Sequence, residues 1–187
     1  MMNDEQVAPR TVVLGVTGSI AAYKACELVR LFVKQGDCVH VVMTAHAQEF
    51  VTPLTFCTLS RNPVARDLFA AKDEWRPGHI SLAEVADLVV VAQATANILA
   101  KMAHGVADDL LSSILLATRA PILVAPAMNT GMYAHPATQA NIAALKARGV
   151  AFVEPVAGEL ACGTAGPGCL AAPAAIAAAA RAYGARQ

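Results

Sequence analysis

Apolar residues along this chain occur in short β-branched runs that alternate with segments of helical spacing. The first run extends from Val12 to Val16 and predicts a buried strand. Small and polar residues interrupt it at 17–19, and from Ile20 the apolar positions recur at helical spacing. A strand, a turn and a helix in this order place backbone N–H groups and the positive helix end beside a ligand, most often a phosphate. The strict G-x-G-x-x-G spacing is absent, so this segment alone is also compatible with an ordinary tight turn.

The same alternation continues along the rest of the chain. Further strands are predicted at 38–43, 88–92, 121–126 and 150–153, and helices at 47–50, 53–59, after His79, from Ile98, from Asp108, at 138–148 and from Pro173. Residues 60–78 have the composition of a loop, and residues 1–10 are expected to form a flexible N-terminus. Strands that alternate with helices predict an α/β fold: a doubly wound parallel sheet of the Rossmann or flavodoxin type, in a single domain spanning 1–187.

Polar turns follow four of the predicted strands, at 17–19, at Thr44, at 95–97 and at 128–129. Ligands of doubly wound sheets bind beyond the carboxyl ends of the strands, so we expect these turns to converge on one edge. A dinucleotide-binding fold would place an acidic residue after the second strand to hold the ribose. Because Thr44 begins that turn instead, the pattern favours a mononucleotide over NAD.

Composition narrows the class of protein. The 187 residues are 56% hydrophobic and 15% charged, with a formal net charge of zero. No basic field is available for nucleic acid or a membrane surface, and the high apolar content predicts surface buried against copies of the same chain. The polar, acidic first residues differ from a signal peptide, and no apolar run is long enough to cross a bilayer, so a cytoplasmic protein is expected. The five cysteines are scattered without metal-ligand spacing, which predicts reduced thiols and no metal site.

Five short motifs, taken together and in order, resemble the homo-oligomeric flavin-containing cysteine decarboxylases. They are Gly-Ser-Ile-Ala-Ala-Tyr-Lys at 18–24, Gly-His-Ile-Ser-Leu at 78–82, Ala-Thr-Ala-Asn at 94–97, Ala-Pro-Ala-Met-Asn at 125–129, and Ala-Cys-Gly at 161–163 with Gly-Pro-Gly at 166–168. Each motif is weak alone, and the likeness extends from Val12 to about Leu170. The resemblance implies FMN as cofactor, bound between neighbouring subunits of a trimer, which in some members assembles further into a dodecamer.

The resemblance also implies which residues hold the cofactor. Its phosphate would be held by Gly18, Ser19, Thr95 and Asn97, and the rest of the FMN site would include Ile20, Thr44, Ala94, Ala96, Ala127 and Met128. Hydroxyl, amide and backbone donors can bind a phosphate dianion without lysine or arginine, which agrees with the neutral net charge.

Three residues match the catalytic positions of the family. His79 would exchange protons with the substrate thiol, although without the family context a surface or capping histidine is the more ordinary interpretation. Asn129 would hold the substrate carboxylate, and its alternative role is a helix N-cap. Cys162, on a mobile substrate clamp at 157–170, would protonate an enethiolate in the branch of the family that acts in coenzyme A biosynthesis. The alternative for Cys162 is a buried structural thiol.

The implied reaction is the conversion of 4′-phosphopantothenoylcysteine into 4′-phosphopantetheine. Flavin oxidises the cysteinyl CH₂–SH group to a thioaldehyde, CO₂ leaves, and the resulting enethiolate is reduced. Three alternatives stay open: oxidative decarboxylation of a peptide C-terminal cysteine, a non-catalytic FMN-binding regulatory subunit of a phosphatase, and an unrelated flavoprotein reductase. The ligase that makes the substrate would be a separate protein, or this chain is an excised domain.

The chain departs from the family pattern at three places. Gln93 replaces the usual proline before the 94–97 turn, which is expected to loosen that turn while leaving phosphate binding intact. Cys169 stands where an arginine is usual, and 171–173 lacks the common acidic residue. Loss of an arginine from the clamp would weaken contact with an anionic substrate, so the substrate is less certain than the chemistry.

Overall fold

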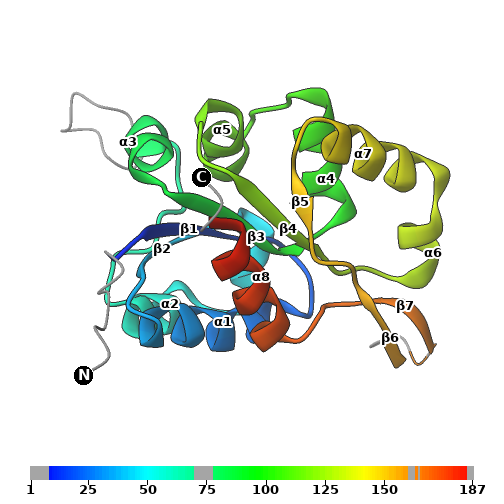
Figure 1. The fold of residues 1–187 in the computed structure, drawn as a ribbon, viewed down its shortest axis with the longest axis horizontal. Coiled ribbons are helices and arrows are strands. Elements are labelled where there is room, and N and C mark those ends of the chain that lie inside the picture. Colours follow the sequence, from blue (N-terminus) through cyan, green and yellow to red (C-terminus); the bar gives the residue numbers. More distant parts are fainter. Residues whose placement is uncertain (1–8, 70–77, 160–162, 164, 185–187) are drawn as a thin grey trace, which may run out of the picture.

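A computed structural model describes residues 9–69, 78–159, 163 and 165–184. Five parallel strands form the central sheet in the order β2-β1-β3-β4-β5 (Figure 1). Their bounds are β1 (Thr11–Val16), β2 (Cys38–Met43), β3 (Leu88–Ala94), β4 (Ile122–Pro126) and β5 (Ala151–Phe152). A separate antiparallel hairpin joins β6 (Val156–Glu159) to β7 (Ala165–Cys169).

Helices cover both faces of the sheet, which makes three layers (Figure 1). One face carries α1 (Ala22–Lys34), α2 (Pro53–Ser60) and α8 (Pro173–Gly184). The other carries α3 (Gly78–Val85), α4 (Ala96–His104), α5 (Leu110–Ala117) and α7 (Pro136–Ala147), while η1 (Ala45–Glu49) and α6 (Thr130–Ala134) are short and follow strand ends.

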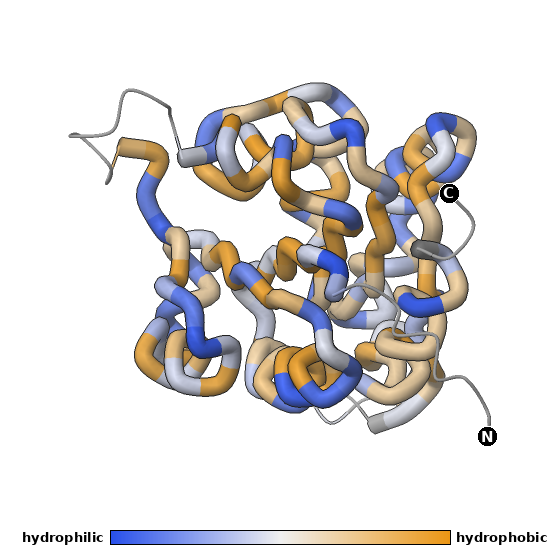
Figure 2. The backbone as a smooth tube through the Cα atoms, turned by 60° about the vertical axis from the view of Figure 1, so that its left-hand side comes forward, coloured by the Kyte–Doolittle hydropathy of each residue, from blue (hydrophilic) through white to orange (hydrophobic). Residues whose placement is uncertain are grey.

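Alternate residues of each strand supply the two cores. In β1, Leu14 faces α1 and α8, whereas Val13 faces the layer that contains α4 and α5. Both side chains are fully buried, as successive side chains of a strand buried on both faces must be. The tube in Figure 2 shows hydrophobic positions gathered in the interior of the molecule.

The strand order creates a switch point beside β1. Residue Val12 pairs with Val39 of β2 on one side and with Leu88 of β3 on the other. The helices that follow β1 and β3, which are α1 and α4, therefore lie on opposite faces of the sheet. The order 2-1-3-4-5 is that of flavodoxin-like sheets, whose ligands bind at the carboxyl ends of β1 and β3.

The predicted strands and most helices are confirmed, and the fold class is that expected from the alternating pattern. Four local differences are found. Gln93 and Ala94 continue β3 instead of forming a turn, so α4 begins at Ala96. The segment predicted as a helix at 47–50 is the 3₁₀ helix η1, and α6 was not predicted because five residues are too few to show periodicity. The glycine-rich segment from 157 contains the β6–β7 hairpin, which has no apolar alternation to reveal it.

The N-terminal segment is anchored at its described end. Arg10 donates from Nε to Asp37 Oδ1 at 2.8 Å and from Nη1 to the carbonyl of Ala180 at 2.8 Å. Arg10 therefore belongs to the folded body, whereas residues 1–8 of the expected flexible N-terminus lie outside the described residues. Among the described residues, no helix combines the length and apolarity needed to cross a bilayer.

Candidate functional site

The turn after β1 presents backbone donors at the carboxyl edge of the sheet. The N–H of Ser19 donates to the carbonyl of Thr17 at 3.0 Å, and the N–H of Ala22 donates to Ser19 at 2.9 Å as α1 begins. The N–H groups of Gly18 and Ile20 have no acceptor among the described residues. A Cβ on Gly18 would lie 2.4 Å from His46 Cβ, so only glycine fits at this point. The turn is thus tightly packed and carries free donors at the N-terminus of α1.

A second set of donors follows β3. Thr95 caps α4, and its Oγ1 accepts from the N–H of Ile98 at 3.4 Å. The N–H groups of Ala96 and Asn97, in the first turn, cannot find acceptors within the helix. The Asn97 side chain is exposed. The first turn of α4 therefore offers backbone, hydroxyl and amide groups in one place.

The turns after β2 and β4 flank these two. The N–H of Thr44 donates to Val16 at 3.1 Å, and that of Ala127 donates to Ala94 at 3.0 Å. Neighbouring strand ends are thus joined directly. The predicted cofactor residues on four strand ends, 18–20, Thr44, 94–97 and 127–128, lie along one edge, as the sequence predicted. Two helix N-termini at this edge favour an anion.

His79 lies on α3, the helix that precedes β3 along the chain. It is the second residue of α3. This helix packs on α5, and the carbonyl of its Ala83 accepts a hydrogen bond from Thr118 Oγ1 at 3.1 Å. The side chain is half-buried, and its Nδ1 is buried without a hydrogen-bond partner among the described residues. A cavity of about 500 Å³ adjoins the start of α3, between Gly78 and 64–68. The histidine therefore has a buried ring nitrogen without a partner among the described residues, and its neighbour Gly78 lines the cavity.

Asn129 begins α6 at the end of β4. Its Oδ1 accepts from the N–H of Gly131 at 2.8 Å, which makes the residue an N-cap, and the side chain is exposed. In Figure 1, α6 and α3 lie on opposite sides of the molecule. A single chain therefore does not bring Asn129 and His79 together.

The hairpin of β6 and β7 is seated against the end of β4. The N–H of Met128 donates to Gly168 at 3.0 Å, and a Cβ on Gly168 would lie 2.2 Å from Met128 O. A Cβ on Gly166 would lie 2.7 Å from Thr130 Oγ1. Residues 166 and 168 therefore have to be glycine because the hairpin lies so close to Thr130 and to the backbone of Met128. Cys162, the predicted proton donor, lies outside the described residues.

Two residues at the site were not among those selected from the sequence. Thr17 was noted only as part of a turn, and Gln93 only as a departure that loosens it. Both are buried and bonded to each other. The sequence could have indicated this pair, because a polar residue occurs at the end of each of two strands that lie side by side in the sheet. The expected loosening is not observed, because Gln93 ties the turns together.

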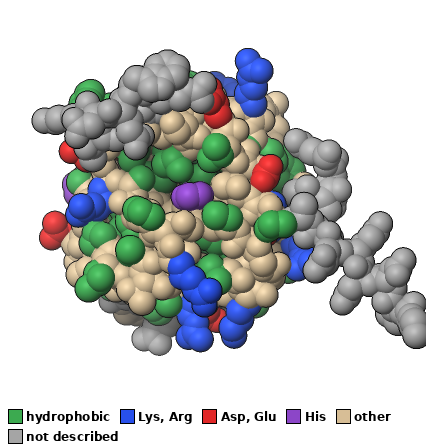
Figure 3. All heavy atoms as spheres, turned by 90° about the vertical axis from the view of Figure 1, so that its left-hand side faces the viewer, with side chains coloured by type: hydrophobic (Ala, Val, Ile, Leu, Met, Phe, Trp, Pro, Cys, Tyr) green, Lys and Arg blue, Asp and Glu red, His purple; other side chains and the backbone are tan. Residues whose placement is uncertain are grey.

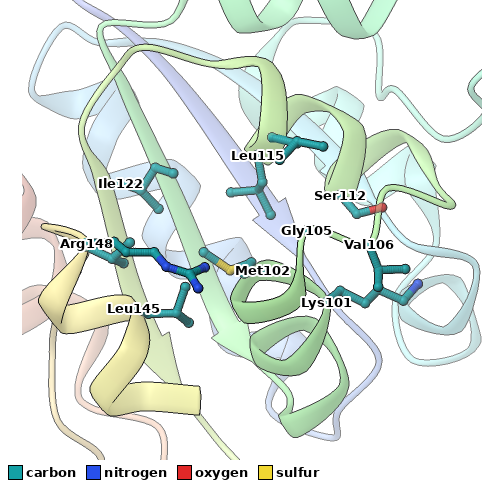
Figure 4. A pocket seen from close by; sticks show the side chains of 11 residues that line it. Lys101, Met102, Gly105, Val106, Ser112, Leu115, Ile122, Leu145 and Arg148 are labelled. Atoms are coloured by element: carbon teal, nitrogen blue, oxygen red, sulfur yellow. The ribbon is translucent and has the colours of Figure 1, made fainter. Parts of the chain in front are cut away.

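A pocket of about 240 Å³ lies at the opposite edge of the sheet (Figure 4). Met102, Leu115, Ile122 and Leu145 line its apolar interior. Ile122 is the first residue of β4, whereas the turns that carry the free donors follow strand ends. This pocket is therefore separate from the candidate site.

Lys101 at the rim of that pocket is already paired. Its Nζ lies 2.6 Å from Asp108 Oδ1 and 2.9 Å from Asp109 Oδ2. Burial alone would lower the pKa of Lys101, but hydrogen bonds and charges from the two aspartates outweigh burial and raise it. Among the described residues, no group of three His, Cys, Asp or Glu side chains could hold a metal ion.

The chain belongs to the Flavoprotein family, whose model matches residues 2–182. It is 48% identical over 169 residues to the coenzyme A biosynthesis bifunctional protein CoaBC of Vibrio cholerae, and 49% identical over 164 residues to that of Bacillus subtilis. These alignments cover 90% and 88% of this chain but 42% and 40% of the relatives. The chain thus spans about two fifths of the length of the curated relatives it matches.

Solved structures with the same fold cover nearly the whole chain. PPC decarboxylase, as a cysteine-to-serine variant with pantothenoylaminoethenethiol, aligns with a TM-score of 0.83 and 31% identity, over 94% of this chain and 98% of its own. The FMN-dependent cysteine decarboxylase SpaF aligns with a TM-score of 0.79 and 32% identity, over 95% and 98%. The FMN-binding protein AtHal3 aligns with a TM-score of 0.82 and 32% identity, over the same shares.

Proposed function

We propose that this chain is an FMN-dependent decarboxylase that converts 4′-phosphopantothenoylcysteine into 4′-phosphopantetheine in coenzyme A biosynthesis. The observation that carries the proposal is the row of free donors at the β1/β3 switch point. It occurs in a chain that matches PPC decarboxylase over 94% of its length. The relatives named for coenzyme A biosynthesis support the same pathway.

The residues present fit the phosphate of FMN. Gly18 lets the turn pack directly against His46, where a Cβ would collide, and the N–H groups of Gly18 and Ile20 are free among the described residues. The hydroxyls of Ser19 and Thr95 can each still donate a proton, because the bonds they make to backbone N–H groups use them as acceptors. Asn97 adds an amide donor. This set binds a dianion at two helix N-termini without a cationic side chain.

The chain's own residues would position the substrate and move protons. Bound FMN would supply the redox chemistry, as a hydride acceptor and donor. His79 takes the thiol proton, and Asn129 holds the carboxylate through its amide. Loss of CO₂ from the thioaldehyde leaves an enethiolate, and Cys162 gives it a proton. The β6–β7 hairpin covers the substrate during these steps.

A complete site then needs two subunits, because Asn129 and His79 lie far apart in one chain. A homotrimer, alone or within a dodecamer, would place His79 of one subunit near the flavin of another. Exposed apolar side chains support such contacts: Ile20 is 58% and Tyr23 is 60% exposed beside the first turn. The face in Figure 3, on the side of α3 and β2, also presents hydrophobic side chains around a histidine at its centre.

The test is release of CO₂ from 4′-phosphopantothenoylcysteine by the purified protein. We expect a yellow preparation that releases FMN on denaturation and turns over this substrate. His79→Asn should abolish CO₂ release and keep the bound flavin, whereas His104→Asn, an exposed position at the end of α4, should change neither. A protein that cannot be loaded with FMN, or a His79→Asn variant with full turnover, would refute the proposal.

The likeness to SpaF favours one second candidate, decarboxylation of a peptide C-terminal cysteine. Cys169, in place of the clamp arginine of the first branch, points the same way. A cysteine-ending peptide assayed beside 4′-phosphopantothenoylcysteine separates the two candidates. Bound FMN without turnover of either substrate would indicate a regulatory subunit instead.

A further inference from the structure

A fully buried glutamine lies between the turn after β1 and the turn after β3. Gln93 is 0% exposed at the carboxyl end of β3, and Thr17 is 2% exposed at the end of β1. A buried polar side chain is costly unless it is hydrogen-bonded. The Gln93 Oε1 is buried without a partner among the described residues, so the bond from Nε2 indicates what the side chain does.

Gln93 and Thr17 bond to each other twice. Gln93 Nε2 donates to the carbonyl of Thr17, and Thr17 Oγ1 donates to the carbonyl of Gln93 at 2.7 Å. The N–H of Thr95 donates to Thr17 Oγ1 at 3.2 Å. The turn after β1 and the turn after β3 are thus held by three bonds that meet at one threonine.

The same carbonyl also shapes the first turn. Thr17 O accepts from the N–H of Ser19 as well as from Gln93 Nε2. Gln93 therefore fixes the orientation of the peptide that precedes Gly18 and Ser19. Thr17 Oγ1, which donates to the main-chain carbonyl of Gln93 and accepts from the N–H of Thr95, links this peptide to Thr95.

We propose that Gln93, acting with Thr17, is a positioning residue that holds the two donor turns at the spacing of a phosphate group and so makes the site prefer FMN over riboflavin. The inference rests on the proposed function, since it assumes that these turns bind the flavin phosphate. Gln93 is buried behind the turns, so it acts on the ligand only through Thr17 and Thr95. The proline usual in the related enzymes has no side-chain donor for this purpose.

The experiment compares the Kd of FMN and of riboflavin for each variant by quenching of flavin fluorescence. Gln93→Met keeps the side-chain length and removes the donor. We expect FMN binding to weaken about tenfold, the size of effect that one hydrogen bond between protein groups can have, with riboflavin affected less than about twofold. Gln139→Met is the matched control, because Gln139 also donates a side-chain bond to a backbone carbonyl, that of Tyr133, outside the two turns. It should leave both constants unchanged.

Variants of Thr17 test the other half of the pair and cover the case in which Gln93→Met fails to fold. Thr17→Val, which keeps the shape and loses the hydroxyl, should weaken FMN selectively, and Thr17→Ser should restore wild-type binding. The double variant Gln93→Met with Thr17→Val removes all three bonds and should weaken FMN binding at least as much as either single variant.

The outcomes separate this inference from the proposed function. Wild-type protein that does not bind FMN refutes both. Wild-type binding together with an unchanged FMN-to-riboflavin ratio in Gln93→Met and Thr17→Val refutes the positioning role alone. Equal weakening of FMN and riboflavin would also refute it, because that result indicates a general packing defect.

Discussion

At the scale of single residues, two glycines show how closely the hairpin approaches the end of β4. Gly168 has φ +143°, and a Cβ there would overlap the carbonyl oxygen of Met128. Gly36, after α1, also has positive φ at +88°, but a Cβ at this position would have no neighbouring atom within 4 Å. A substitution at Gly36 therefore tests backbone strain alone, whereas one at Gly168 tests strain together with steric overlap.

We predict that Gly168→Ala lowers the free energy of unfolding by about 2–4 kcal/mol, the sum of left-handed strain and overpacking. Gly36→Ala should lower it by about 1–2 kcal/mol, from strain alone. Chemical denaturation measures both values. Hydrogen exchange of the Met128 amide, which donates to Gly168, should accelerate only in the first variant. Equal losses and an unchanged Met128 amide would show that the close approach is unimportant.

A second prediction at this scale concerns Cys162, the thiol proposed to protonate the enethiolate. Cys162→Ser should leave CO₂ release from 4′-phosphopantothenoylcysteine nearly unchanged, because the thiol acts after CO₂ leaves. An oxidised enethiol product should then accumulate, and mass spectrometry detects it two hydrogens lighter than the normal product. The exposed Cys57 of α2 provides the control substitution to serine. If Cys162→Ser still forms the normal product, another residue donates this proton.

At the scale of elements, α5 begins with a charged cap. Asp109 Oδ1 accepts from the N–H of Ser112 at 2.8 Å, while Asp109 Oδ2 accepts from Lys101 at 2.9 Å. Burial raises the pKa of Asp109, but the bonds from Ser112 and Lys101 outweigh burial and hold it below its ordinary value. The cap thereby joins α4 to α5 through one carboxylate.

This shift predicts the acid sensitivity of the fold. A carboxyl group with a lowered pKa in the folded state stabilises the protein above its unfolded pKa of about 4, and that contribution disappears as pH falls through the folded pKa. Asp109→Asn keeps the N-cap and removes the charge. Urea denaturation between pH 7 and 2 should show wild type more stable than the variant at neutral pH, with the difference vanishing in acid. A constant difference across this range would contradict the charge effect.

At the scale of the whole molecule, the separation of His79 and Asn129 predicts complementation between inactive subunits. His79→Asn and Asn129→Ala should each be inactive alone. If each site takes its histidine and its asparagine from different subunits, randomly mixed oligomers contain both native residues at about one quarter of their sites. Co-expression followed by a CO₂ assay should therefore recover about a quarter of wild-type activity. No recovery in verified mixed oligomers would place both residues in the same subunit.

The hydrophobic pattern alone determined the architecture, because a strand buried on both faces needs a continuous apolar run and a covering helix needs apolar residues at its own spacing. It also placed polar turns at one edge, since parallel strands all end there. The resemblance supplied the identities of His79, Asn129 and the cofactor residues, which no periodicity reveals.

Only the tertiary structure decided how those turns are held. The bonds between Gln93 and Thr17 join residues 76 positions apart, and nothing local to either residue indicates its partner. The hairpin at Gly166 and Gly168 was likewise hidden, because its strands are specified by contact with Met128 and Thr130 and not by alternating side chains. Patterns within the sequence report interactions between near neighbours, and the spacing of a ligand site depends on contacts between distant segments that only the folded chain brings together.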